Sequence, residues 1–310
     1  MSVGILGSGF GLYGYLPSLV LGFDERIILP ARYQAKLSRR DELAPFAKNI
    51  EWVPDDAAVP QRADTLIISR RPEDQVALVM QALRISTIRR FILEKPIAPT
   101  PVEAHALLDV LERTASRVRI SYIFRFEPWA DLLAEWVKSA DESEAFSIRW
   151  NFRAHHHVTN LDTWKRRPAQ GGGAIRFYGV QLIGLLAELG YTDVMNSQVT
   201  SSRAGEHCLW TAALSGRGLP RCLVSVDTTS DPACFEIRGH GSARRPLEII
   251  SVDPFGCAGQ AGALDRRIGG LTKLYGSLLH DADAMPPWYR SSVQLWQAIE
   301  VATPEPVHVR

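Results

Sequence analysis

The chain has 310 residues, a length that allows two domains of ordinary size and a large core. Apolar residues make up 46% and charged residues 22%, the balance of a globular protein. The formal net charge of +1 argues against nucleic acid or an anionic membrane as the main partner, and apolar runs such as 182–189 are too short to span a bilayer.

The segment 3–14, VGILGSGFGLYG, starts with a short apolar run and turns glycine-rich at once. It lacks the basic stretch of a signal peptide, so we expect a buried strand that enters a loop. Further β-like runs at 26–29, 65–69, 90–93 and 118–124 alternate with helical stretches, which predicts a parallel sheet with crossover helices. Thr100, Pro101 and Glu103 predict a capped start for the helix before the last run.

The pattern changes after about residue 125. A helix at about 128–138 leads to alternating apolar and polar segments, which indicate an antiparallel or mixed sheet with one covered and one available face. A helix opened by glycines, 174–189, interrupts these strands, and a final amphipathic helix is expected at about 291–302. The fold class is therefore α/β, with a first domain at 1–122 and a second at 123–310.

The sequence gives no indication of a metal site. Cysteines at positions 208, 222, 234 and 257 lack the close spacing of zinc or redox motifs, so we expect reduced thiols in a cytoplasmic protein. His155, His156 and His157 are consecutive, and side chains that alternate at a strand end diverge too far to share one metal ion.

A cofactor site is predicted where the first strand meets its helix. Gly7 allows a tight turn, and Gly9 lets backbone N–H groups approach a pyrophosphate at the helix N-terminus. The strict fingerprint has a third glycine where Leu12 stands. Arg32 follows the second strand at about the position where an acid would bind the ribose of NAD, and a guanidinium suits the 2′-phosphate of NADP. The sequence therefore predicts NADP in preference to NAD. The alternative is that Arg32 is only solvated.

Six landmarks in order carry a resemblance to a known family. They are GSGFGLYGYLPSL at 7–19, LIISRRPEDQ at 66–75, EKP at 94–96, FRFEP at 124–128, GGGAIRFYGVQLIG at 171–184 and EIRGHGS at 236–242. With these motifs the chain resembles the Gfo/Idh/MocA oxidoreductases, the group of glucose–fructose oxidoreductase and inositol dehydrogenase, over nearly its whole length.

The resemblance implies a Rossmann domain joined to an α/β domain whose large open-faced sheet often serves as an oligomer interface, hence a homodimer or homotetramer. It implies a nicotinamide cofactor and a sugar, cyclitol or nucleotide-sugar substrate. In the family the lysine of EKP, here Lys95, lies near the nicotinamide and polarises the substrate oxygen, a role that suits a cation beside a developing alkoxide. The implied cofactor contacts are Gly7, Ser8, Gly9, Phe10, Gly11, Arg32, Ser69, Arg70, Arg71, Glu94 and Lys95.

The chain departs from the family pattern at the usual acid–base pair. The family's Asp and, four residues later, His are replaced by Phe177 and Gln181, and neither side chain exchanges a proton near neutral pH. A four-residue spacing would place both on one helix face, where we expect a wall and a hydrogen-bonding contact. The family's His after the strand-end loop is Gln75 here, and small loop residues have become Arg70 and Arg71.

Other titratable groups are candidates for proton transfer. Tyr178 neighbours Phe177 on the same helix. A histidine is a suitable general acid–base near pH 7, and of the three histidines we select His157. The alternative is a surface loop whose histidines do nothing chemical. Nearby basic residues such as Lys165 would hold a phosphate or stay solvated. Substrate contacts are expected from Arg125, Arg153, His155, Trp164, Arg166, Phe177 and Gln181.

The leading hypothesis is an NAD(P)-dependent oxidoreductase that transfers a hydride between nicotinamide and a sugar-like carbinol or carbonyl carbon. Lys95 would polarise the substrate oxygen, with Tyr178, a histidine or water carrying the proton. The loss of both titratable helix residues motivates a second hypothesis, a non-catalytic sensor of NAD(P) or a metabolite. A reductase of another electrophile, such as an imine, is a third.

Overall fold

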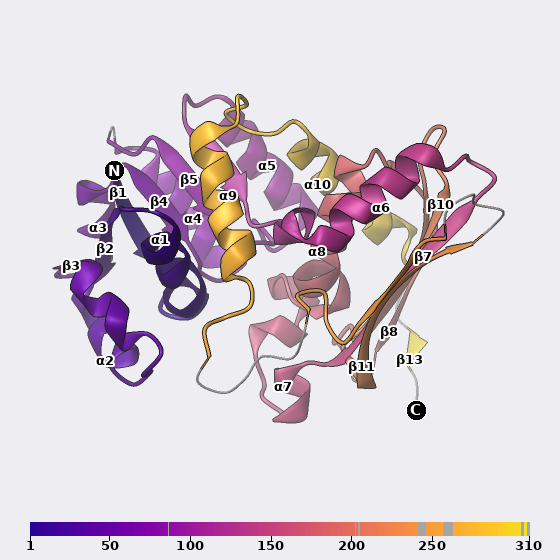
Figure 1. Cartoon of the computed structure of the whole chain (residues 1–310), viewed down its shortest axis with the longest axis horizontal. Coiled ribbons are helices and arrows are strands. Elements are labelled where there is room, and N and C mark those ends of the chain that lie inside the picture. The colour runs from indigo at the N-terminus through magenta and orange to yellow at the C-terminus, as the bar shows by residue number, and fades with distance from the viewer. Residues whose placement is uncertain are drawn as a thin grey trace. The chain divides into compact units, whose positions relative to one another are not determined.

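Six parallel strands form the first sheet of the computed structural model (Figure 1). Their order, β3-β2-β1-β4-β5-β6, is the doubly wound order that reverses beside β1. Their residues are buried almost without interruption, as expected when helices cover both faces of a parallel sheet. The strands are β1 (Ser2–Leu6), β2 (Arg26–Pro30), β3 (Ile50–Val53), β4 (Thr65–Ile68), β5 (Arg90–Leu93) and β6 (Arg117–Ile120).

The structure describes residues 1–85, 87–201, 203, 205–240, 246–256 and 263–304, with the backbone of 307–308. Two predicted features therefore lie outside the described residues, namely Cys257 and the end of the EIRGHGS landmark. The helices that accompany the first sheet are α1 (Leu16–Gly22), α2 (Gln34–Leu37), α3 (Val59–Arg62), α4 (Pro72–Ala82), α5 (Pro101–Glu112) and α9 (Ile268–His280).

Contacts between Cα atoms divide the chain into two compact units. The first contains Met1–Ile97, Leu107–Ile123 and Gly259–Pro286, and the second contains Ala98–Ala106, Phe124–Ala258 and Pro287–Arg310. The boundary at residues 122 and 123 stays a prediction. The two units are not continuous in sequence. A late stretch that includes α9 belongs to the first unit, and residues 98–106 belong to the second.

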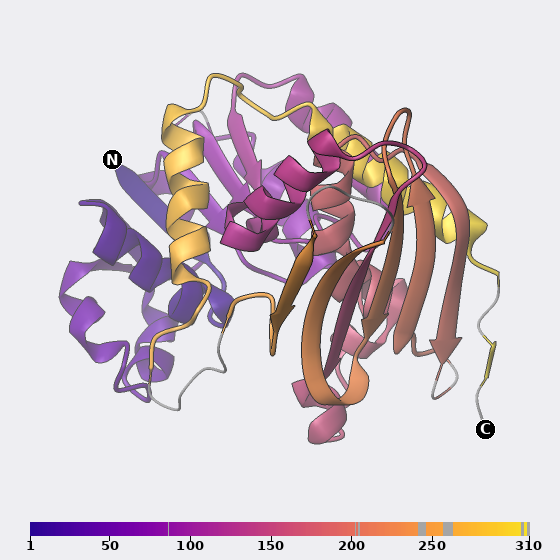
Figure 2. The ribbon, with the colours of Figure 1, turned by 45° about the vertical axis from the view of Figure 1, so that its right-hand side comes forward.

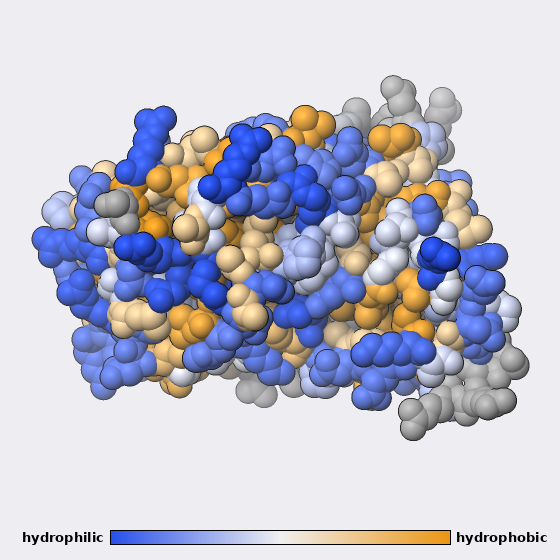
Figure 3. All heavy atoms as spheres, turned by 90° about the horizontal axis from the view of Figure 1, so that it is seen from above, coloured by the Kyte–Doolittle hydropathy of each residue, from blue (hydrophilic) through white to orange (hydrophobic). Residues whose placement is uncertain are grey.

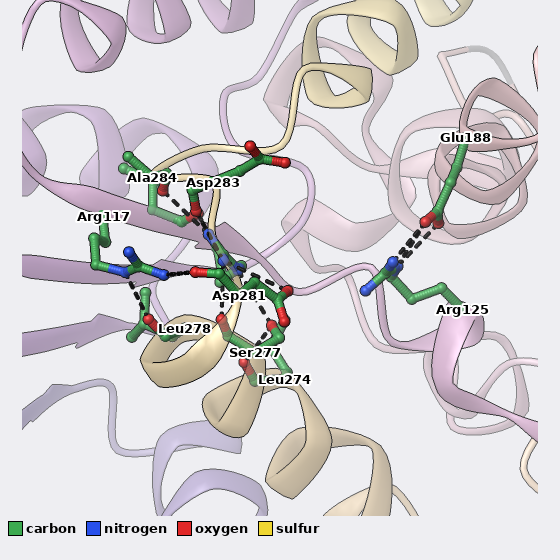
Figure 4. Close-up of polar contacts among 11 residues, drawn as sticks. Arg117, Arg125, Glu188, Leu274, Ser277, Leu278, Asp281, Asp283 and Ala284 are labelled. Atoms are coloured by element: carbon green, nitrogen blue, oxygen red, sulfur yellow. Dashed lines mark hydrogen bonds and ion pairs between the residues drawn. The ribbon is translucent and has the colours of Figure 1, made fainter.

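Two arginines of β6 hold the late segment in the first unit. Arg119 is 1% exposed, and its guanidinium donates to the carbonyl of Ser277 at 2.9 Å and to those of Asp283 and Ala284 at 3.1 Å. Arg117 donates to the carbonyls of Leu278, at 2.9 Å, and Asp281 (Figure 4). These cations lie where α9 ends, so they satisfy its free carbonyls and complement its dipole. Figure 1 shows the result, with α9 beside α1.

The second unit contains a mixed sheet in the order β12-β11-β7-β10-β9-β8-β13. β10 pairs with β7 in parallel and β13 with β8 in parallel, whereas the other neighbours are antiparallel. The strands are β7 (Ala145–Arg153), β8 (Asp193–Ser201), β9 (Leu209–Ser215), β10 (Arg221–Asp227), β11 (Thr229–His240), β12 (Glu248–Ser251) and β13 (Val307–His308). The helices are α6 (Pro128–Ser139), α7 (His155–Val158), α8 (Val180–Glu188) and α10 (Trp288–Ala302).

One face of this sheet is covered and the other is open. In Figure 1, α6, α8 and α10 lie on the same side of the sheet, and no helix of the drawn ribbon covers the other side. Figure 2 shows the open side as a curved array of neighbouring strands. The strand pattern agrees, because Cys222, Val224 and Val226 of β10 are buried while Leu223 between them is exposed.

The surface carries no large continuous apolar area on the side seen in Figure 3, where hydrophobic residues form small patches among hydrophilic ones. In the described part of the chain, no helix is both long and apolar enough to cross a membrane.

The structure confirms most of the predicted elements. Thr100 caps α5 as expected: its hydroxyl accepts the N–H of Glu103 at 3.3 Å and donates to that side chain at 2.7 Å. The final helix begins at Trp288, three residues before the predicted start. The predicted run 118–124 was too long, because β6 ends at Ile120 and a 3₁₀ turn follows at Ile123–Phe126.

Candidate functional site

The glycine loop of the first unit follows β1 directly. Gly7 has φ +149°, and a β-carbon there would lie 2.2 Å from the carbonyl oxygen of Ser69, which follows β4. The ends of β1 and β4 therefore approach so closely that only glycine fits. The N–H of Gly7 donates to the hydroxyl of Tyr33 at 2.9 Å, so a side chain that follows β2 fixes the start of the loop.

The backbone at Gly9 faces open space. A β-carbon there would meet no atom within 4 Å, and the Gly9 carbonyl accepts the N–H of Leu12 at 2.9 Å as the helix begins. A turn of π-helix, Gly11–Tyr15, precedes α1. Leu12, which replaces the third glycine, is buried in the core. The space beside Gly9, at a helix N-terminus, fits the approach of a dinucleotide pyrophosphate.

A cluster of charged side chains lies at the ends of β2, β3 and β4. Arg32 binds the carboxylate of Asp56 through two hydrogen bonds, of 2.8 and 2.5 Å, and Arg70 donates to the same carboxylate. Arg70 also donates to the hydroxyl of Tyr33 at 3.1 Å. Lys36 donates to the hydroxyl of Ser8 in the glycine loop at 2.8 Å. The structure thus brings the predicted site residues Arg32 and Arg70 together near the loop, around Asp56, an acid that the sequence analysis had not identified.

The remaining predicted residues of this region have other surroundings. The N–H of Ser69 donates to the carbonyl of Leu6 at 2.8 Å, which continues the β1–β4 pairing. Arg71 is exposed and precedes Pro72, the first residue of α4. The ring of Phe10 lies under the guanidinium of Arg267, 4.1 Å from the ring centre, an aromatic contact that leaves the loop backbone accessible.

Gln75 of α4 holds the EKP loop. Its side chain is completely buried, and its amide nitrogen donates to the carbonyls of Glu94 at 2.8 Å and Ile97 at 3.1 Å. Its amide oxygen accepts the N–H of Glu94 at 2.9 Å. Lys95 lies between these anchor points, half-buried, and its bond to Pro96 is cis. The amide of Gln75 thus fixes the backbone on both sides of Lys95.

Glu94 links this loop to the glycine-loop helix. The hydroxyl of Tyr15 donates to its carboxylate at 2.7 Å. Burial raises the pKa of Glu94, while the charge of Lys95 and the hydrogen bond from Tyr15 oppose that rise. Burial also raises the pKa of Tyr15 well above its usual value, so the phenol remains a donor. The acid therefore shapes the loop and gives Lys95 a neighbouring negative charge.

In the second unit, the glycine-opened helix is fixed by Arg176. Its guanidinium binds the carboxylate of Glu300 in α10 at 2.6 and 2.7 Å and donates to the carbonyls of Pro99 at 2.9 Å and Pro168 at 2.7 Å. A β-carbon at Gly172 would lie 2.2 Å from the carbonyl oxygen of Trp164, so the chain before the helix is tightly packed as well.

The predicted helix at 174–189 is present, but it does not begin as an α-helix. A turn of π-helix, Ala174–Gly179, precedes α8. A π-turn places residues on the surface with a longer period than an α-helix, so a spacing of four no longer guarantees one shared face. Accordingly Phe177 is partly exposed, whereas Gln181 is only 4% exposed.

Tyr178 lies within an aromatic cluster. The centre of its ring is 4.8 Å from that of Phe152, 4.7 Å from Phe177 and 5.8 Å from Trp150, all edge to face. The ring of His156 is stacked at 6.2 Å. Trp150 is 7% exposed, and within the described structure its indole N–H has no hydrogen-bond acceptor. The cluster thus offers aromatic faces, which suit the C–H faces of a hydroxylated ring.

The three histidines were expected at the end of a strand. Instead, β7 ends at Arg153, and His155–Val158 form a short helix. His156 points inward and is 5% exposed, whereas His155 is exposed. Burial, with a smaller contribution from His157, lowers the pKa of His156 to about 4. Burial and the nearby Arg166 also lower the pKa of His157. Both imidazoles are therefore neutral at pH 7 and can exchange hydrogen bonds rather than carry charge.

Three arginines predicted to bind substrate are held by acids. Arg166 is 6% exposed and pairs with Glu206 at 3.0 Å. Arg153 lies 3.4 Å from Asp231 at the exposed end of β7. Arg125 forms a two-pronged pair with Glu188 at the C-terminal end of α8, the opposite end of the helix from Tyr178 (Figure 4).

The structure brings other predicted residues together around Phe177. The edge of the Trp164 ring packs against Phe177 with 5.3 Å between centres, and the ammonium of Lys165 lies 5.0 Å from the Phe177 ring centre. In the described part of the chain, no group of three or more His, Cys, Asp and Glu side chains is arranged to hold a metal ion.

No family model matches the chain. A putative oxidoreductase of Bacillus subtilis, YteT, is 22% identical over 146 residues, which is 46% of this chain and 34% of that relative. The chain therefore matches about a third of the length of this curated relative.

Solved structures match over the full length. The WlbA dehydrogenase of Thermus thermophilus, in complex with NAD and UDP-GlcNAcA, is 15% identical with a TM-score of 0.71, covering 100% of this chain and 97% of its own. KijD10, a 3-ketoreductase of Actinomadura kijaniata in complex with NADP, is 14% identical with a TM-score of 0.69, covering 100% of this chain and 99% of its own. A putative myo-inositol dehydrogenase of Sinorhizobium meliloti is 14% identical with a TM-score of 0.73, covering 97% of this chain and 96% of its own. The α/β fold is that of the Gfo/Idh/MocA dehydrogenases.

Replacing Gln75 by alanine tests its role as the anchor of the EKP loop. Gln75→Ala removes the donor to the carbonyls of Glu94 and Ile97, so we expect a loss of roughly 1–3 kcal/mol of stability and a lower midpoint of thermal unfolding. Gln81→Ala, on an exposed position of the same helix, is the matched control and should change little. Equal unfolding midpoints for the two variants would show that Gln75 is not an anchor.

The pH dependence of stability tests the burial of His156. Between the unfolded pKa of 6.5 and the folded pKa of about 4, only the unfolded chain binds the proton, so stability falls as the pH drops through this window. We expect His156→Gln to remove a slope of about 1.4 kcal/mol per pH unit from urea unfolding measured between pH 7 and 4. The exposed neighbour gives the control, His155→Gln, which should keep the slope. The same pH dependence in both variants would contradict the account.

Proposed function

We propose that the protein is an NAD(P)-dependent oxidoreductase acting on a sugar, cyclitol or nucleotide-sugar. The observation that carries the proposal is the position of Lys95. It stands at the C-terminal end of β5, where Gln75 fixes the loop on both sides and Glu94 ties the loop to the glycine-loop helix. The carboxyl ends of such strands are where doubly wound sheets bind their ligands.

The proposed chemistry is transfer of a hydride between the substrate carbon and the nicotinamide, which a bound NAD(P) accepts or supplies. Lys95 donates a hydrogen bond to the substrate oxygen and stabilises the negative charge that develops on it. When a carbonyl is reduced, the nicotinamide supplies the hydride and the proton of the new hydroxyl comes from Tyr178, from one of His155, His156 and His157, or from water. Burial disfavours the charged form of His156 and His157, so either side chain would hold an accepted proton only weakly.

The aromatic cluster supports a substrate with a ring. Aromatic faces pack against the apolar C–H faces of a sugar or cyclitol, and the rings of Trp150, Phe152 and Tyr178 lie together in this cluster. A phosphate held by Arg166 receives less support, because this arginine is buried and paired with the nearly buried Glu206.

We infer a preference for NADP from the basic cluster beside the glycine loop, where Arg32 and Arg70 present guanidinium groups suited to a 2′-phosphate. The solved neighbours include complexes with NAD and with NADP, so the fold itself is compatible with either. We also propose a cytoplasmic location, in line with the free thiols of Cys208, Cys222 and Cys234.

A non-catalytic sensor is the second candidate. The aromatic Phe177 and the buried amide of Gln181 stand where the resemblance implies an acid–base pair, and neither titrates near neutral pH. Such a protein would bind cofactor tightly and turn over no substrate.

The variant Lys95→Ala separates the two functions. A substrate screen with NADPH and NADH should cover sugars, cyclitols, nucleotide-sugars, keto compounds and imines. We expect turnover on one of them, lowered about 10²- to 10³-fold in kcat by Lys95→Ala because an electrostatic contact to the reacting oxygen is lost. Lys48→Ala, on an exposed lysine of the same unit, should leave kcat unchanged. Turnover that survives in Lys95→Ala would contradict the mechanism, and tight NADPH binding with no turnover would favour the sensor.

We further propose that the open sheet face packs against a second copy of the chain in a homodimer or homotetramer. This face has a hollow of about 470 Å³ lined by Arg149, Leu223, Glu236 and Arg238, where both arginines donate to Glu236. Apolar and paired charged groups on one face suit a self-complementary interface.

Sedimentation velocity tests this interface. Leu223→Glu places a charge in the proposed contact and should convert the oligomer to monomers at micromolar concentration, whereas Leu132→Glu, on an exposed position of α6, should not. A wild-type chain that sediments as a monomer would refute the proposal.

A further inference from the structure

Asp56 occupies the two arginines that we assign to the 2′-phosphate of NADP. The acid lies in the turn after β3, and its carboxylate binds Arg32 in a two-pronged pair of 2.8 and 2.5 Å while accepting a hydrogen bond from Arg70. Strands β2, β3 and β4 supply one member each, so the cluster is built across three strand ends.

The cluster has more positive charge and donors than Asp56 satisfies. Two guanidinium groups share one carboxylate, and Lys36 adds a third cation through its contact with Ser8 of the glycine loop. The Nε of Arg70 is buried and has no acceptor within the described structure. A buried donor without an acceptor is costly, which favours binding of a further anionic group at this position.

The pair between Asp56 and Arg32 is open to exchange. The side chains of Arg32 and Asp56 are 50% and 31% exposed, and ion pairs with this exposure contribute little to stability. A phosphate monoester carries up to two negative charges and three acceptor oxygens, so it is a stronger partner for a guanidinium fork than a single carboxylate.

We propose that Asp56 is an internal competitor of the cofactor's 2′-phosphate and thereby sets the selectivity between NADP and NAD. In the free protein its carboxylate neutralises part of the charge on Arg32 and Arg70. Binding of NADPH replaces this carboxylate with the phosphate, so part of the phosphate's binding energy is used to break the internal pair. This inference rests on the NADP preference proposed above and adds the residue that limits it.

The test is the affinity of Asp56→Asn for NADPH and NADH, measured by titration of the reduced nicotinamide's fluorescence without any substrate. Asparagine keeps the shape of the side chain and removes its charge, so we expect the NADPH Kd to fall about tenfold. The NADH Kd should stay within about twofold, since NADH has no 2′-phosphate. Asp55→Asn is the control, because this exposed neighbour accepts the N–H of Ala58 and touches neither arginine in the contacts described.

Two further variants separate failure of this inference from failure of the NADP preference. Arg32→Gln and Arg70→Gln should each weaken NADPH binding at least tenfold and leave NADH binding unchanged. If they do so while Asp56→Asn binds NADPH like the wild type, the inference is wrong and the NADP preference stands. If Asp56→Asn instead weakens NADH binding, Asp56 accepts the ribose hydroxyls of NAD, and both proposals are overturned. Asp56→Ser repeats the measurement should the asparagine variant not fold.

Discussion

The carboxamide of Gln75 fixes the backbone on which the proposed chemistry depends. Its nitrogen holds the carbonyls of Glu94 and Ile97, and its oxygen holds the N–H of Glu94. An amide meets this need because it donates and accepts at once, whereas a carboxylate only accepts and an ammonium only donates. It also keeps the same hydrogen-bonding character at every pH, so the geometry around Lys95 does not change with protonation of its anchor. Gln75 therefore acts as a structural support for the loop that carries Lys95.

The same loop connects two parts of the first unit. Glu94 binds Tyr15 of the glycine-loop helix, and Tyr33 binds the N–H of Gly7 at the start of that loop. The loop that would receive the pyrophosphate and the loop that carries Lys95 are thus held through separate side chains to the same framework. Preorganisation of this kind fixes a catalytic cation before ligand binds, which is what electrostatic stabilisation of a developing charge requires.

The sequence predicted most of the fold because its strands are apolar and its turns carry glycine and proline. It missed β3, whose IEWV segment is only half-buried at the sheet edge, and β8, whose DVMNSQVTS segment is largely polar. IEWV is too short and too exposed to form a clear apolar run, and DVMNSQVTS has no regular alternation of apolar and polar residues, so neither pattern indicates a strand. The π-turns before α1 and α8 were missed as well, because widening of a helix depends on packing around it and not on a residue pattern.

The candidate site was predicted less completely than the fold. Roles for Gly7, Gly9 and Lys95 could be predicted from local geometry or from the resemblance, and these roles stay predictions. The partners of the arginines were not, since Asp56 is 24 residues from Arg32 and Glu188 is 63 residues from Arg125. Only the fold brings such charges together. The sequence also did not indicate the short helix that contains the three adjacent histidines. In this helix His156 is the buried one.

A crystal structure of the ternary complex with NADPH and a substrate from the screen tests the central claim most directly. The account predicts that the ammonium of Lys95 lies within hydrogen-bonding distance of the oxygen on the carbon that exchanges hydride. It also predicts that the Gln75 contacts to Glu94 and Ile97 are unchanged from those described here. A reacting oxygen held by another side chain, with Lys95 directed away from the substrate, would contradict it.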